Sequence, residues 1–254
     1  MTTNESRCLL AGRCKLAGTD ACTSQCSSFI SIHGRNGLGG RAGAANVPKD
    51  YRLVTLANSP ARESQAKIYD FLAKQYVPTF ERQFEAEGKR VKSLYLWSES
   101  PGTGKTTTAA ALLNEWLIRH YIGSIKRGQQ PLQQPAYFLD VNELQTLYNE
   151  FTRRNIPTEV AEKASREYYR RLERAKTAPF AVYDDIGVRD ATDGFRGDLH
   201  SAINYRTINA MPTVYTSNLP IEEMEKVFDA RLYDRMRDMC AVFEFGGQSK
   251  RGKR

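Results

Sequence analysis

The 254-residue chain has no apolar run that approaches the roughly 20 residues needed for a membrane-spanning helix. Its first residues, 1–7, lack the basic-then-apolar order of a signal peptide. These absences predict a cytoplasmic protein without a membrane partner.

The chain is moderately basic, with 37 Lys and Arg residues against 29 Asp and Glu residues and a net charge of +8. Four of the positive charges lie in the last residues, 249–254. A surplus of this size fits a nucleic-acid partner, and it fits ordinary solubility equally well. The length allows one large domain together with a small module.

The most specific motif is a glycine-rich loop between an apolar run, 94–97, and a helix-like run, 107–117. This order of strand, glycine loop and helix is typical of sites for nucleoside triphosphates, because backbone N–H groups and the helix N-terminus face the phosphates. Lys105 is expected to reach the β- and γ-phosphates of ATP, and the Thr106 hydroxyl to bind Mg²⁺. The residues expected to contact the nucleotide are Ser100, Pro101, Gly102, Thr103, Gly104, Lys105, Thr106 and Thr107.

The loop departs from the full pattern at one position, where Glu99 stands in place of glycine. A carboxylate near phosphates opposes binding unless it points away. The alternative is a chance glycine-rich turn. The flanking elements and a later acidic strand favour the phosphate loop.

That acidic strand is Phe180–Asp185, in which four apolar or aromatic residues precede two carboxylates. Such a run suits a strand buried on both faces of a parallel sheet, with its acids where these sheets bind ligands. Asp184 is expected to hold Mg²⁺, and Asp185 to orient or deprotonate the attacking water. The alternative is a surface Asp-Asp turn.

Strands and helices are expected to alternate from residue 92 onward. The expected strands are Lys92–Trp97, Pro135–Leu139, Phe180–Asp184, Thr213–Ser217 and Ala241–Phe245. Apolar residues at helical spacing predict helices over 64–87, 141–154 and 221–239, the second beginning with a capping box of Asp140 and Glu143. Alternation of this kind predicts an α/β fold with a parallel sheet.

Four of the five cysteines lie near the start of the chain: Cys8, Cys14, Cys22 and Cys26. Clustered cysteines in a cytosolic protein favour a metal, so residues 1–34 are expected to form a small zinc-binding (Zn²⁺) module. The alternative is unliganded cysteines in a disordered tail. His33 is expected to be structural, and Cys240 to be a small buried hydrophobe. Glycines predict a flexible linker over 35–46, leaving 47–254 for the ATPase domain.

In their order, these motifs resemble those of DnaC/DnaI-type replicative helicase loaders, of bacterial or phage origin, over residues 47–251. The resemblance implies a P-loop AAA+ domain, a three-layer α/β/α fold around a five-stranded parallel sheet. A C-terminal helical lid is not expected, because only nine residues follow the fifth strand. An Asp-Asp pair stands where many relatives of the wider superfamily have Asp-Glu, which puts fast turnover in doubt.

The resemblance also implies roles for residues outside the loop and the acidic strand. Asn218 matches a sensor asparagine, and Arg235 an arginine finger that acts on the neighbouring subunit's ATP. Arg251 matches a C-terminal sensor arginine. The alternatives are a turn-forming asparagine before Pro220, a solvated face shared with Arg231, and a basic tail.

Single-stranded DNA is expected to bind where these loaders carry a DNA-binding element, at the end of the helix after the second strand. The candidates are Phe151, Arg153, Arg154 and, on the loop after the acidic strand, Arg189. An aromatic side chain beside arginines suits base stacking with phosphate contact. The alternative places Phe151 in a core stripe and the arginines on a solvated face.

The sequence as a whole predicts an ATPase with slow, switch-like hydrolysis that delivers a hexameric replicative DNA helicase onto single-stranded DNA during replication. ATP or helicase binding is expected to assemble it as a homo-oligomer, with residues 1–34 docking the helicase. One alternative is a transposition-helper ATPase of the IstB type, against which the cysteine cluster argues. The other is a non-hydrolysing adaptor, which Glu99 and Asp185 keep open.

Overall fold

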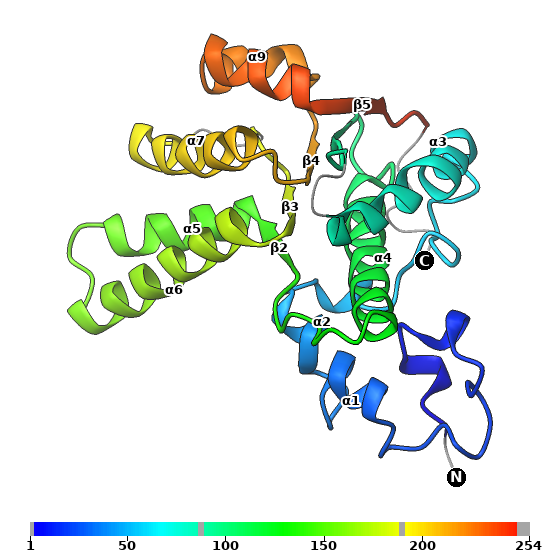
Figure 1. Ribbon diagram of the computed structural model, residues 1–254. Helices are drawn as coiled ribbons and strands as arrows, with labels where there is room; N and C mark the ends of the chain where they lie inside the picture. The colour runs from blue at the N-terminus through cyan, green and yellow to red at the C-terminus, as the bar shows by residue number, and fades with distance from the viewer. Residues whose placement is uncertain (1–2, 86–88, 188–190, 248–254) are drawn as a thin grey trace. The chain divides into compact units, whose positions relative to one another are not determined.

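The computed structural model describes residues 3–85, 89–187 and 191–247 (Figure 1). The chain divides into two compact units, which we describe separately. Unit 1 comprises residues 1–89 and 110–137, and unit 2 comprises residues 90–109 and 138–254. Within the described residues, no helix has both the length and the apolar character required to span a membrane.

The strands form one five-stranded sheet with the order β2-β3-β4-β1-β5. The strands are β1 (Ser93–Trp97), β2 (Ala136–Asp140), β3 (Phe180–Asp184), β4 (Thr213–Ser217) and β5 (Cys240–Glu244). The pairs β1–β4, β1–β5 and β3–β4 are parallel. The five predicted strands are confirmed, two with identical bounds and three within one residue at each end.

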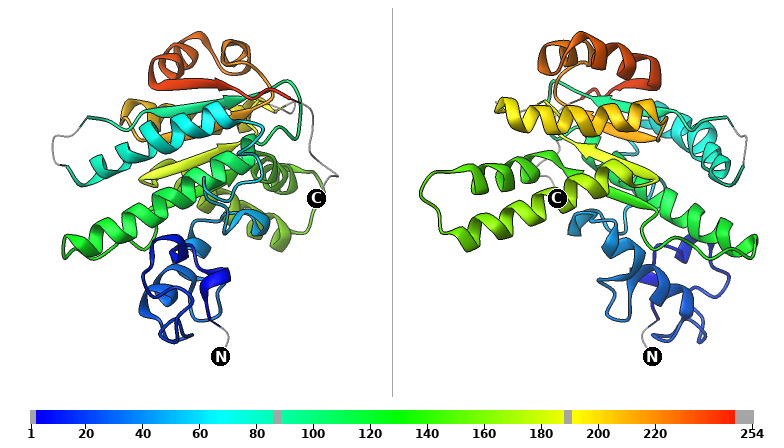
Figure 2. Two further views of the ribbon diagram at one scale, coloured as in Figure 1. Left: turned by 90° about the vertical axis from the view of Figure 1, so that its right-hand side faces the viewer. Right: turned by 60° about the vertical axis from the view of Figure 1, so that its left-hand side comes forward.

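The helices of unit 2 follow one another along the sheet. They are α5 (Val141–Thr152), α6 (Thr158–Thr177), α7 (Asp193–Ile208), the short η6 (Ile221–Glu223), α8 (Met224–Val227) and α9 (Ala230–Met239). Helices α5, α6, α7 and α9 lie side by side on one face of the strands, and the loop between α5 and α6 projects beyond the sheet (Figures 1 and 2). The predicted capping box begins α5, where the Asp140 carboxylate accepts the Glu143 N–H at 2.9 Å.

The helix predicted over 221–239 is divided in the structure. Phe228 ends α8 with a non-helical backbone, and Asp229 starts α9 by accepting the Leu232 N–H at 2.7 Å. Apolar spacing alone missed this break, because Met224, Leu232 and Met236 are buried on both sides of it. The N-cap at Asp229 therefore decides where α9 begins.

Unit 1 contains the N-terminal segment, residues 1–89, and most of a long helix, α4 (Lys105–Lys126), which begins in unit 2. Its other helical segments are η1 (Glu5–Arg7), η2 (Ala11–Arg13), α1 (Ser27–His33), α2 (Gly40–Ala44), η3 (Lys49–Tyr51), α3 (Ala66–Phe71), η4 (Leu72–Tyr76) and η5 (Val77–Phe84). The last three form a continuous helical run inside the predicted range 64–87.

The N-terminal segment of unit 1 has an apolar core of its own. Leu9, Leu10, Phe29 and Ile32 are each at most 6% exposed. His33 is buried beside them, and its Nε2 accepts the Leu9 N–H at 3.0 Å. The imidazole is therefore a structural group that ties α1 to the turn at residue 9.

The segment predicted to be a flexible linker, 35–46, differs in the structure. It contains α2, from which the buried Arg41 guanidinium donates to the carbonyls of Ser31, Pro131 and Leu132 at 2.7–2.9 Å. The glycine content predicted a flexible segment without fixed contacts. The structure instead anchors this segment within unit 1 through a buried arginine that donates to carbonyl groups. Removal of residues 1–45 would eliminate these contacts, because it removes Arg41.

Candidate nucleotide-binding site

The glycine-rich loop lies between the end of β1 and the start of α4. Gly102 and Gly104 have φ values of +73° and +102°, a left-handed backbone that glycine adopts without a Cβ penalty. The Lys105 Nζ donates to the carbonyls of Ser98 and Ser100, both at 3.3 Å. These two acceptors are neutral, so neither cancels the charge that a phosphate would bind. Glu99 lies on the exposed part of the loop.

The first acid of β3 lies directly beside this loop. The Asp184 carboxylate is 6% exposed and accepts hydrogen bonds from the Thr106 hydroxyl at 3.2 Å and the Thr216 hydroxyl at 2.6 Å. Burial, with the Asp185 charge, raises the pKa of Asp184 from 3.8 to about 7. A buried carboxylate beside a threonine hydroxyl is the oxygen donor set that Mg²⁺ prefers, so these residues fit the metal.

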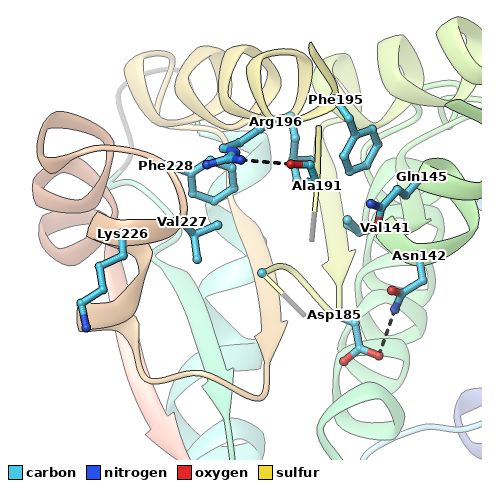
Figure 3. A pocket seen from close by; sticks show the side chains of 12 residues that line it. Val141, Asn142, Gln145, Asp185, Ala191, Phe195, Arg196, Lys226, Val227 and Phe228 are labelled. Atoms are coloured by element: carbon cyan, nitrogen blue, oxygen red, sulfur yellow. Dashed lines mark hydrogen bonds between the residues drawn. The ribbon is translucent and has the colours of Figure 1, made fainter. Parts of the chain in front are cut away.

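The second acid has an unusual backbone. Asp185 has φ +60°, which is uncommon for a residue with a side chain. Its carboxylate accepts a hydrogen bond from Asn142, at the start of α5, at 3.5 Å. Figure 3 shows this pair on the wall of a pocket of about 280 Å³ between α5, α7 and α8.

The predicted sensor residue, Asn218, lies on the loop that follows strand β4. Asn218 follows Ser217, the last residue of β4, and is partly buried. The Tyr95 hydroxyl on β1 donates to the Leu219 carbonyl at 2.9 Å, which ties this loop to the sheet. Since β4 pairs with β3 and Thr216 accepts the Asp185 N–H, the end of β4 that Asn218 follows lies beside the end of β3, where the two acids lie.

The predicted arginine finger lies on α9. Arg231 and Arg235 are both exposed, as a residue that acts on another subunit must be. The Arg235 guanidinium donates to the side-chain oxygen of Asn204 on α7. Arg251 and Arg189 lie outside the described residues.

The predicted DNA-binding residues divide into two kinds. Phe151 packs in an aromatic cluster, with ring centroids 5.2 Å from Tyr148 and 5.4 Å from Tyr168. The cluster joins α5 to α6, as the core-stripe alternative described. Arg153 and Arg154 are exposed and directly follow α5, in the loop between α5 and α6. This loop projects beyond the sheet (Figure 2).

The predicted zinc site is not supported. Cys8, Cys14, Cys22 and Cys26 all belong to the described part of the chain, yet nowhere in that part do three His, Cys, Asp or Glu side chains gather as metal ligands. The cysteines therefore do not fit a tetrahedral thiolate site in this arrangement. Cys240 is buried at 5% exposure, as predicted.

Sequence reasoning missed Thr216 and Asn142, which contact the two acids. Both belong to elements distant in the chain from residues 184 and 185, so no local motif contains them. Thr216 belongs to a strand that was predicted from the sequence without a role for any of its own residues. Only the pairing of β3 with β4 shows that its hydroxyl reaches the acids.

The sheet order, the phosphate loop after β1, the acids at the end of β3 and the polar end of β4 are those of an α/β protein with the AAA+ fold. Solved structures agree on this fold. The crystal structure of DnaI superposes with a TM-score of 0.52 at 23% identity, covering 79% of this chain and 95% of that one. The DnaC helicase loader superposes with a TM-score of 0.51 at 20% identity, covering 78% and 100%.

Curated relatives confirm the resemblance predicted from the motifs. The replicative helicase loader DnaI of Bacillus subtilis is 27% identical over 190 residues, 70% of this chain and 53% of that protein. The replicative helicase loader DnaC of Escherichia coli K12 is 28% identical over 165 residues, covering 65% and 55%. The phage-like element PBSX protein XkdC of B. subtilis is 28% identical over 208 residues, covering 79% and 67%.

No protein-family model matches the chain. The matched region spans about half the length of the DnaI and DnaC loaders. The chain therefore resembles replicative helicase loaders in its sequence and shares the AAA+ fold with them.

Proposed function

We propose that this protein is an ATP-dependent loader that delivers a hexameric replicative DNA helicase onto single-stranded DNA during replication, in the cytoplasm of a bacterium or of a phage-infected host. The observation that carries the proposal is the convergence of Thr106 and Asp184 beside the phosphate loop. The similarity to proteins named as replicative helicase loaders supports the choice of partner.

Each residue of the site has a proposed task in ATP hydrolysis. Lys105 would bind the β- and γ-phosphates, and Thr106 and Asp184 would hold Mg²⁺, which would neutralise charge at the phosphates. Asp185 and Asn218 orient the attacking water, and Asp185 accepts its proton. Zinc has no part in the proposal, because the described cysteines do not gather.

Arg235 is proposed to complete the site of a neighbouring subunit in an ATP- or helicase-induced homo-oligomer. It is exposed on α9, and it donates a hydrogen bond to the neutral side chain of Asn204. A guanidinium with a neutral partner keeps its full positive charge. That charge can then stabilise the transferring phosphoryl group of an adjacent nucleotide.

The single-stranded DNA contact is proposed to lie at the exposed end of α5, through Arg153 and Arg154. Phe151 is assigned to the aromatic core of the α5–α6 pair rather than to base stacking. Arginines without an aromatic platform contact phosphates, so we expect binding without sequence preference and with strong salt dependence.

A reconstituted loading reaction tests the proposal. The full chain is incubated with candidate hexameric helicases and ATP on single-stranded DNA coated with single-strand-binding protein, and unwinding is measured. Wild-type protein should stimulate unwinding by its cognate helicase, and Lys105→Ala should not. Lys67→Ala, the same substitution at an exposed lysine of α3 outside the phosphate loop, is the matched control. Equal stimulation by Lys105→Ala and wild type would refute an ATP-dependent role.

Phosphate release separates an enzyme from the non-hydrolysing adaptor. The proposal expects slow release that requires Mg²⁺ and both Lys105 and Asp184. Stimulated loading by wild-type protein without any phosphate release would favour the adaptor instead.

A further inference from the structure

One hydroxyl group bridges the two acids of the candidate site. The Thr216 hydroxyl lies 2.6 Å from the Asp184 carboxylate and 2.9 Å from the Asp185 backbone nitrogen. Thr216 belongs to β4 and is 0% exposed. It is 32 residues away from Asp184 in the chain, so β-sheet pairing alone brings the groups together.

The direction of each hydrogen bond follows from the donors present. The Asp185 N–H can only donate, so the Thr216 oxygen accepts there. The single hydroxyl proton is then directed to Asp184, which accepts it. The hydroxyl thus donates its only proton to Asp184 and accepts from Asp185, which fixes the Asp184 side chain and the Asp185 backbone relative to each other.

The backbone at Asp185 requires such support. Its φ of +60° lies in the left-handed region, which residues with a Cβ rarely adopt. Strand β4 holds the next residue as well, since the Ile186 N–H donates to the Thr216 carbonyl at 2.9 Å. The Ser217 hydroxyl donates to the Ile186 carbonyl at 2.7 Å. The end of β4 therefore holds the turn that presents the second acid.

We infer that Thr216 is a positioning residue for hydrolysis, whose hydroxyl holds Asp184 toward Mg²⁺ and keeps Asp185 in the backbone conformation that directs its carboxylate to the attacking water. This inference rests on the proposed function, because it concerns the same site. The phosphate loop contacts the nucleotide independently of Thr216, so loss of the hydroxyl should affect turnover more than ATP affinity.

Three variants of the full chain test this role by kcat, the KM for ATP and thermal unfolding. Thr216→Val keeps the shape and removes the hydroxyl, and should lower kcat on the order of tenfold, the effect of one lost hydrogen bond of typical strength. The KM for ATP should change less than kcat. Thr216→Ser restores the hydroxyl and should return kcat to near the wild-type value.

Thr213→Val is the matched control on the same strand. Its hydroxyl is also 0% exposed, but it bonds the Arg206 guanidinium at 2.7 Å, at the end of β4 away from the acids. The control should lower the unfolding temperature and leave kcat unchanged. If Thr216→Val does not fold, Thr216→Ala removes the same hydroxyl and carries the same expectations.

The outcomes separate this inference from the proposed function. Wild-type protein with no phosphate release refutes the proposed enzyme, and the inference with it. Wild-type turnover with an unchanged kcat in Thr216→Val refutes the inference alone. A fall in kcat that Thr216→Ser does not rescue, or that Thr213→Val reproduces, also overturns it.

Discussion

Acidification from pH 7 to pH 5 should lower the free energy of unfolding of this protein, because two histidines of unit 1 are buried in their neutral form. His33 is 3% exposed and His120 is 7% exposed. Burial, with the nearby Arg7 charge, lowers the pKa of His33 from 6.5 to about 4. Burial, with the Arg41 charge, lowers the pKa of His120 by the same amount.

The hydrogen bonds of the His33 and His120 rings require the neutral form of each imidazole. In each, Nε2 accepts a backbone N–H at 3.0 Å, from Leu9 to His33 and from Leu132 to His120. Nε2 therefore carries no proton, and the His120 Nδ1–H donates to the Gln83 side chain at 2.7 Å. Protonation of either Nε2 would place two donors face to face and leave a charge buried.

The sign and size follow from linkage. The folded pKa lies below the unfolded value, so the stability that each neutral histidine contributes is complete above pH 6.5 and is lost as the pH falls toward 4. Between pH 7 and pH 5 the loss is about 2 kcal/mol for each histidine. Total stabilities are typically about 5–15 kcal/mol, so two such losses are substantial.

The assay is urea unfolding of wild-type protein and His33→Gln at pH 7 and pH 5. A glutamine oxygen accepts the Leu9 N–H as Nε2 does but does not titrate, so the variant should lose about 2 kcal/mol less than wild type on acidification. Asp184, whose raised pKa acts in the opposite direction, is present in both proteins and cancels in the difference. Equal pH dependence in the two proteins would falsify the assignment of His33 as a buried neutral group.

Three further predictions follow from other parts of the molecule. Arg235→Ala should retain ATP affinity and lose turnover. Mixing it with Lys105→Ala subunits should restore some ATPase activity, since one interface then pairs an intact lysine with an intact arginine. A mixture that stays inactive, while wild-type subunits exchange normally, contradicts action in trans. Arg206→Met should destabilise the protein by roughly 3 kcal/mol or more in urea unfolding, because it leaves several buried carbonyls without a donor; a loss under about 1 kcal/mol would contradict this. Elemental analysis of protein purified without chelator should show no zinc that depends on the N-terminal cysteines. If the protein instead holds about one equivalent of zinc, and replacing these cysteines with serine removes it, the zinc site predicted from the sequence is correct.

The Arg206 prediction shows a feature that local pattern could not reveal. This arginine is 0% exposed, and its guanidinium donates to Thr213 and to the carbonyls of Ala175, Lys176, Ala178 and Pro212 at 2.7–3.1 Å. In the sequence it is one basic residue among many. Its role depends on the end of α6, the end of α7 and the start of β4 meeting at one point.

The N-terminal segment shows where composition misled. Clustered cysteines and glycines predicted a zinc module on a flexible linker. The structure instead stabilises the segment with buried apolar side chains and with the hydrogen bonds of His33 and Arg41. Composition could not show this, because scattered apolar residues form a core only after the chain folds back on itself.

The sequence by itself determined the parts of this protein that depend on neighbouring residues. The phosphate loop, the acidic strand, the capping box at Asp140 and the five strands were predicted from residues close together in the chain, because glycine conformation, strand burial and helix capping are local effects. The tertiary structure alone decided which distant groups meet. Thr216 reaches both acids, Asn142 reaches Asp185 and Arg206 joins three elements, because the pairing of β3 with β4 and the packing of helices along the sheet set those contacts.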